Sequence, residues 1–186
     1  AAGAEEPDEL LGELLDHAMD SLTGLHADTE YGGWLSEPGT VTRKMTYDHV
    51  HVGLAASSAL GVGHPAAAPL LAQVVDVIDG RLWDPDAQAL LESFAPDWSD
   101  SEDYRGANAN MHGLEAFIAM GHATGDAVWH ERGLAIADRR VDEVAAHPAA
   151  GLRVAEEVPF ALHDVADHVE RERLVRRRHG RRQLQQ

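Results

Sequence analysis

The chain has 186 residues, a net charge of −17 and a hydrophobic fraction of 44%, enough for one domain with a buried core. It contains no cysteine, which excludes disulfides, thiolate metal sites and cysteine nucleophiles. Its acidity disfavours nucleic acids and anionic lipids as partners, and it shows neither a long apolar run nor a recognisable signal peptide. We therefore expect a cytoplasmic protein with no nucleic-acid or membrane partner.

The distribution of charge is uneven along the sequence. Acids dominate residues 1–150, Lys44 is the single lysine, and arginines gather in residues 151–186. Such a surplus of carboxylates is typical of proteins that stay soluble in concentrated salt, because carboxylates hold water and salt screens their repulsion. High-GC codon usage gives the same composition, so both interpretations stay open.

Apolar spacing predicts an all-α protein, because helical periodicity recurs and alternating strand patterns are nearly absent. Pro7 suits the first turn of a helix, and a leucine stripe follows it. A YGGW loop and a long acidic loop interrupt the helical segments. The predicted helices span residues 7–24, 43–60, 65–82, 107–123 and 126–145, and the loops span 31–34 and 84–104.

Two of these segments form a repeat at an offset of about 62 residues, a spacing typical of helical-hairpin arrays. Helices 43–60 and 65–82 match helices 107–123 and 126–145 in order, length and turn chemistry, with Gly63 aligned to Gly125. The first helix of each pair is rich in small residues and the second is amphipathic. This division predicts antiparallel hairpins in a closed α/α toroid or in an open solenoid.

The segment RGANANMH, residues 105–112, carries the most informative polar pattern. It lies where the acidic loop meets an apolar helix, and Asn108 and His112 are four residues apart, so they share one helical face. An amide beside an imidazole suits the binding of a sugar hydroxyl and the movement of a proton. Asn108 also suits a helix N-cap, which is the alternative interpretation.

Three further segments extend this pattern into a resemblance to the N-acylglucosamine 2-epimerase superfamily. The segment DYRGANANMHGLEAFIAMGHATGDAVWHERGLAIADR (103–139) is similar to one of its hairpins, and KMTYDHVHVGLAASSALGVG (44–63) is similar to the preceding inner helix. YGGW (31–34) and DWS (97–99) also match, so the resemblance covers about residues 10–145. Its superfamily includes cellobiose epimerases, mannose isomerases and sulfoquinovose isomerases, and the helix at 44–60 favours the mannose isomerase branch.

The resemblance implies an (α/α)6 barrel that isomerises or epimerises a sugar through a cis-enediol, with no metal or redox cofactor. On this basis His112 is expected to be catalytic, and Tyr47, Asn108 and Arg105 are expected to bind the substrate. General chemistry agrees, since a carbon acid beside a carbonyl needs a base that works near neutral pH, and the enediolate needs fixed donors. Tyr47 is equally compatible with a packing role. The expected partner is a small sugar, and a homodimer is left open.

The sequence also departs from the family pattern. The barrel requires later hairpins with a Pro-Gly-His segment and a following glutamate, another histidine, and an arginine on an earlier helix, and we find none of these. We therefore predict that residues 1–150 form part of a barrel and that the isolated chain lacks part of the acid/base machinery. Residues 151–186 are predicted to be a divergent, partly disordered segment in which the arginines belong to a solvated tail.

Two rival functions remain. Asp97, Asp100, Glu102 and Asp103 could supply the paired carboxylates of a glycoside hydrolase on a related toroid, although a solvated acidic loop is the simpler interpretation. A non-catalytic helical fragment or binding module is the second rival. A metal site is not expected, because His49 and His51 point to opposite sides of a helix, which predicts a supporting or structural role for both.

Overall fold

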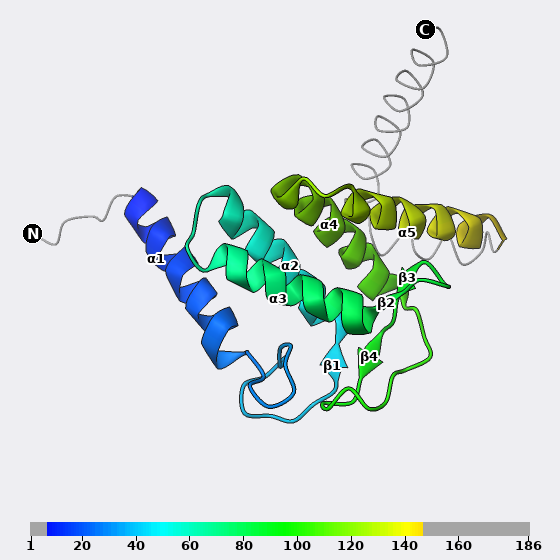
Figure 1. The fold of residues 1–186 in the computed structure, drawn as a ribbon, viewed down its shortest axis with the longest axis horizontal. Helices are drawn as coiled ribbons and strands as arrows, with labels where there is room; N and C mark the ends of the chain where they lie inside the picture. The colour runs from blue at the N-terminus through cyan, green and yellow to red at the C-terminus, as the bar shows by residue number, and fades with distance from the viewer. Residues whose placement is uncertain (1–6, 147–186) are drawn as a thin grey trace, which may run out of the picture. The chain divides into compact units, whose positions relative to one another are not determined.

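The computed structural model describes residues 7–146, over which the chain is mainly helical (Figure 1). Contacts divide the chain into two units, residues 1–136 and 137–186, and the second is described only where the last helix continues into it. The prediction for residues 151–186 lies outside the described residues. The helices are α1 (Pro7–Asp20), α2 (Thr46–Gly61), α3 (Ala67–Val77), α4 (Ala107–Thr124) and α5 (Ala127–Ala146), and π-helical turns η1 (Ser21–Leu25) and η2 (Ile78–Leu82) prolong α1 and α3.

The five predicted helices are confirmed, but the connections contain short strands that the sequence pattern did not reveal. β1 (Lys44–Met45) pairs antiparallel with β4 (Ser93–Phe94), and β2 (Trp83–Asp84) pairs antiparallel with β3 (Ala89–Leu90). Because β1 takes the residues before Thr46, α2 begins three residues later than predicted. Within residues 7–146, no helix is long and apolar enough to cross a membrane.

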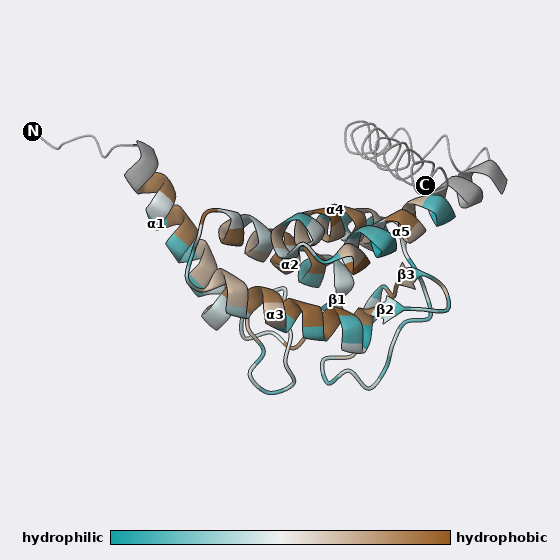
Figure 2. Ribbon diagram, turned by 45° about the horizontal axis from the view of Figure 1, so that its top comes forward, coloured by the Kyte–Doolittle hydropathy of each residue, from teal (hydrophilic) through white to brown (hydrophobic). Residues whose placement is uncertain are grey.

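Small residues on α2 let the helices of the first unit approach closely. A Cβ atom added to Gly53 would lie 3.1 Å from Cγ1 of Val74 on α3 and 3.3 Å from Sδ of Met120 on α4. The ring of Phe117, also on α4, lies 5.3 Å from that of Trp129 on α5. Figure 2 shows the apolar composition of α3, whose buried side chains face this core. α2 therefore packs between α3 and α4, as expected for an inner helix.

The two hairpin turns use the same backbone device. Gly63 has a φ of 78°, and Gly125, which caps α4, has a φ of 73°. Both angles lie in the left-handed region that glycine adopts without a steric penalty. The glycine alignment on which the predicted repeat rested is thus matched in the backbone of both hairpins.

A buried lysine ties the YGGW loop to the start of α2. The Lys44 side chain has no exposed surface, and its Nζ lies 2.5 Å from Oδ2 of Asp28 and 2.7 Å from the Gly32 carbonyl oxygen. The same Nζ lies 5.1 Å from the centre of the Trp98 ring, and Trp98 Nε1 donates to the Tyr31 carbonyl at 2.8 Å. Burial alone would raise the pKa of Asp28, but hydrogen bonds from Lys44 and the loop backbone outweigh it and lower that pKa.

His49 forms a second buried connection between α2 and this loop. Its Nδ1 lies 2.7 Å from the Met45 carbonyl oxygen, so it carries the proton, and its Nε2 accepts a hydrogen bond from the Trp34 backbone N–H at 3.2 Å. Burial is the main cause that lowers the pKa of His49 from 6.5 to about 4. This imidazole is therefore neutral and structural, in agreement with the supporting role expected for it.

Replacing the buried lysine should destabilise the fold. We expect Lys44→Met to lower the free energy of unfolding by about 3 kcal/mol, because the Asp28 carboxylate loses its buried counterion. Urea denaturation of the wild type, Lys44→Met, Asp28→Asn and the double variant measures the coupling between the two side chains. Additive effects of the two substitutions would show that the pair contributes no interaction energy.

The pH dependence of stability should carry the signature of His49. As the pH falls from 6.5 toward 4, the unfolded chain takes up a proton before folded His49 does, so this group removes up to about 3 kcal/mol of stability. The loss begins near the unfolded pKa and is complete below the folded one. Unfolding curves of wild type and His49→Gln over this range should converge toward low pH, and parallel curves would contradict the assignment.

Candidate active site

Tyr47 and His112, two of the predicted site residues, lie against each other at the packed face between α2 and α4. Their ring centres are 5.1 Å apart and their planes are perpendicular. His51, one turn along α2, completes the group, with its ring centre 4.3 Å from that of Tyr47 and 4.8 Å from that of His112. Tyr47 is 37% exposed and both histidines are partly exposed, so the three-ring cluster (Tyr47, His51 and His112) is accessible to solvent.

Hydrogen bonds fix the tautomers of both histidines in the three-ring cluster. Nδ1 of His112 lies 2.9 Å from Oε2 of Glu115, and Nδ1 of His51 lies 2.8 Å from the Tyr47 carbonyl oxygen. Each partner oxygen is an acceptor, so each Nδ1 carries the proton, and each Nε2 offers a lone pair when the ring is neutral. Over the described residues, neither Nε2 has a hydrogen-bond partner.

Asn108 lies one turn before His112 on α4, on the same face of the helix, as predicted. Its side chain is exposed and has no hydrogen-bond partner within the described part of the chain. The alternative interpretation of Asn108 as the N-cap is wrong, because the N-cap position is Gly106 and no side chain caps it. The Asn108 amide is thus exposed to solvent one turn before His112.

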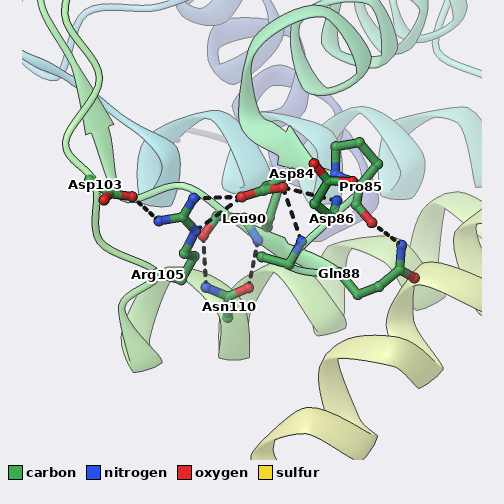
Figure 3. A network of polar contacts seen from close by, with 9 residues as sticks. Asp84, Pro85, Asp86, Gln88, Leu90, Asp103, Arg105 and Asn110 are labelled. Atoms are coloured by element: carbon green, nitrogen blue, oxygen red, sulfur yellow. Dashed lines mark hydrogen bonds and ion pairs between the residues drawn. The ribbon is translucent and has the colours of Figure 1, made fainter.

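Arg105 occupies a different environment from the three-ring cluster. Its Nη2 and Nε lie 2.5 Å and 3.2 Å from Oδ2 of Asp84, and its Nη1 donates to Asp103 (Figure 3). The hydrogen bond from Arg105 is the main cause that lowers the pKa of Asp84. The structure therefore brings Tyr47 and His112 together, but it commits three donors of Arg105 to carboxylates of the connecting segment.

Asn110, which no sequence pattern distinguished, positions the first turn of α4. Its Oδ1 accepts a hydrogen bond from the Leu90 backbone N–H at 2.8 Å, and its Nδ2 donates to the Leu90 carbonyl oxygen at 3.0 Å (Figure 3). The same Nδ2 donates to the Gly106 carbonyl oxygen at 2.9 Å. All of these groups are buried, so the loss of any one would leave an unpaired partner. Asn110 therefore fixes α4 relative to β3.

The extended segment 90–93 also holds the start of α2. The Thr46 backbone N–H donates to the Glu92 carbonyl oxygen at 3.0 Å, and Thr46 Oγ1 donates to the Leu91 carbonyl oxygen at 2.5 Å. The Glu92 side chain lies beside Gly106 at the N-terminus of α4, and its Oε2 is buried without a hydrogen-bond partner among the described residues. Burial is the main cause that raises the pKa of Glu92, the Glu102 charge adds to it, and the nearby Gly106 backbone opposes it.

The acidic loop holds its carboxylates in local contacts. Asp100 pairs with Arg43 at 3.1 Å, Asp103 pairs with Arg105, and Asp97 accepts a hydrogen bond from Ser99. These contacts agree with a structural role for the loop. Over the described residues, no three histidine, aspartate or glutamate side chains gather in a group that could hold a metal ion.

Comparison with known proteins places these helices in a larger architecture. The chain is 48% identical over 135 residues to a D-mannose isomerase of Pseudomonas cannabina pv. alisalensis. The matched segment is 71% of this chain and 33% of that protein. The structure superposes on a crystal structure of a D-mannose isomerase with a TM-score of 0.61 at 26% identity, over 68% of this chain and 35% of the other. Cellobiose 2-epimerase from Bacillus thermoamylovorans B4167 shares the fold, with a TM-score of 0.62 at 20% identity over 70% and 38% of the two chains.

The chain thus spans about a third of the length of the relatives it matches. Its antiparallel hairpins form part of an α/α toroid, which confirms the predicted fold class and favours the toroid over an open solenoid. The family model for N-acylglucosamine 2-epimerase matches residues 1–161, which is most of the sequence. The chain therefore belongs to the N-acylglucosamine 2-epimerase family.

Proposed function

We propose that this chain supplies part of the substrate site of a sugar isomerase or epimerase, with D-mannose as the first sugar to test. The observation that carries the proposal is the contact between Tyr47 and His112, made by side chains from two different helices and accessible to solvent. Family membership and the names of the relatives support it. The C2 proton is removed to give a cis-enediol, and a proton then returns to C1, which gives a ketose, or to the opposite face of C2, which gives an epimer.

In this proposal His112 is the base that removes the proton beside the sugar carbonyl. Its Nδ1–H is held by Glu115, so Nε2 is the acceptor, and the Glu115 carboxylate stabilises the imidazolium that forms. The enediolate then needs hydrogen-bond donors that are already in place. Tyr47, in contact with the His112 ring, supplies a phenol, and Asn108, one turn earlier on α4, supplies an amide.

We propose that Arg105 binds the substrate only with those N–H donors that its ion pairs leave available. A guanidinium has five N–H donors, and Asp84 and Asp103 take three of them. The remaining donors can bind sugar oxygens while the ion pairs hold the arginine in one orientation. The same ion pairs link β2 to the segment that leads into α4.

The proposal includes the finer expectations from the sequence. We propose a cytoplasmic enzyme that needs no metal or redox cofactor and binds neither nucleic acid nor membranes, and homodimer formation is left to measurement. The glycoside hydrolase alternative is less favoured, since Asp100 and Asp103 are paired with arginines and a general acid needs a carboxyl free to donate.

A chimeric enzyme tests the proposed role of His112. We expect that the D-mannose isomerase of Pseudomonas cannabina pv. alisalensis keeps activity when its matched 135-residue segment is replaced by the one from this chain. His112→Ala in that chimera should lower turnover at least ~10²-fold, the scale of losing a general acid/base group. Conversion of D-mannose to the ketose is followed by NMR.

His122→Ala is the matched control, because His122 lies on the same helix, is exposed, and is outside the three-ring cluster. It should leave turnover near that of the parent chimera. An inactive chimera with a native-like circular dichroism spectrum would favour the non-catalytic alternative. Equal activity of the two alanine variants would remove His112 from the chemistry.

A further inference from the structure

His51 is the one member of the three-ring cluster that has no part in the proposed function so far. It lies one turn after Tyr47 on α2 and directly beside His112, with the two imidazole centres 4.8 Å apart. His49, two residues earlier, points the other way and is buried, so the two histidines of the His-x-His pair serve different environments. His51 faces the same side as the proposed base.

The hydrogen bonds of the two neighbouring imidazoles leave the same kind of atom available. His51 and His112 both carry their proton on Nδ1, and both present Nε2 as an acceptor. They differ in the partner that holds Nδ1. Glu115 is a carboxylate and supports a cationic ring at His112, whereas a neutral backbone carbonyl holds His51.

Aldose–ketose isomerisation moves two protons, and one base does not account for both. The carbon proton passes from C2 to C1, and a hydroxyl proton passes from O2 to O1. Because O2 is bonded to C2, a group beside the carbon base can reach the hydroxyl that must lose its proton. The ring of His51 is such a group, since its centre lies 4.8 Å from that of His112.

The geometry points to His51 as the residue that transfers the hydroxyl proton, an inference that rests on the proposed function. His112 Nε2 first takes the C2 proton, the released electron pair forms the C1–C2 double bond, and negative charge passes to O1. His51 Nε2 then takes the proton from O2, and the imidazole returns a proton to O1. The charge, now on O2, forms the C2 carbonyl as C1 takes the proton from His112, so both histidines end in their starting states.

Helix packing supports separate roles for His51 and His112 in proton transfer. Gly53 lets α2 approach α4 and α3 closely, and the first turn of α2 is anchored through Thr46 to the segment that also holds α4. His51 is therefore kept at a fixed place beside His112. A packing role alone requires only an aromatic ring against Tyr47, which phenylalanine would also supply.

Ligand binding to the full 186-residue chain, labelled with 15N in its histidine side chains, tests the inference. D-mannose should shift the Nε2 resonances of both His51 and His112 along the same saturation curve. 2-Deoxy-D-glucose, which is mannose without the C2 hydroxyl, should shift His112 and leave His51 unchanged. His51→Phe and His112→Ala assign the two resonances, and His122→Ala is the control.

The same assay separates the two proposals. If D-mannose shifts neither resonance, the proposed function is contradicted and the role of His51 falls with it. If His112 responds while His51 does not, or if the two sugars shift His51 equally, the role of His51 is contradicted and the proposed function stands.

A second measurement addresses proton transfer itself, in the active chimera described above. In D2O, His51→Phe should still exchange the C2 proton of D-mannose for deuterium while ketose formation falls, so the ratio of exchange to isomerisation should rise at least ~10-fold. Added imidazole should restore ketose formation to His51→Ala. A parallel fall of exchange and isomerisation in His51→Phe, without rescue by imidazole, would show that His51 only packs.

Discussion

The burial of the Lys44 ammonium is the constraint on which the arrangement of the site depends. A lysine without exposed surface must be neutralised and hydrogen-bonded, and both partners, the Asp28 carboxylate and the Gly32 carbonyl, belong to the loop that precedes it. Lys44 also lies in β1, whose partner strand β4 belongs to the connection leading to α4. Since α2 begins immediately after β1, the buried ion pair determines where Tyr47 emerges.

The helix that carries His112 is fixed by a complementary set of contacts. Its N-cap residue, Gly106, has no side chain, so the free N–H groups of the first turn need partners from elsewhere. Asn110 links this turn to the backbone of Leu90 and to the Gly106 carbonyl oxygen. The segment 90–93 therefore touches the first turns of both α2 and α4. This shared anchor explains how an irregular connection can hold the first turns of α2 and α4 in fixed positions.

Much of this fold could be predicted from sequence, because long helices carry a periodic apolar signal. The five helices and the glycine turns at Gly63 and Gly125 were identified correctly. Strands of two residues are too short to show an alternating pattern, so β1 to β4 were missed. Whether α2 and α4 pack against each other is a property of tertiary structure, which local periodicity does not encode, although the repeat predicted that both are inner helices.

The same distinction holds for the site. Asn108 and His112 could be paired from spacing alone, and Glu115 could have been found in the same way, since it lies three residues after His112 on the same helix. The proximity of Tyr47 and His51 to His112 depends on a contact between residues more than sixty positions apart. The ion pair between Arg105 and Asp84 was equally hidden, because it forms only when the β2–β3 hairpin folds back toward the start of α4.

The contrast between His49 and His51 shows how one helix assigns different chemistry to the same residue type. The two are about 200° apart around α2, so one must face the core if the other faces the site. His49 loses its solvent, satisfies both ring nitrogens with backbone groups, and has its pKa lowered to about 4. His51 uses Nδ1 alone, and its Nε2 has no hydrogen-bond partner within residues 7–146. A buried, neutral imidazole such as His49 can hold α2 in place but cannot reach a substrate. The proton transfer that we propose for His51 instead needs a ring nitrogen without a partner in the protein.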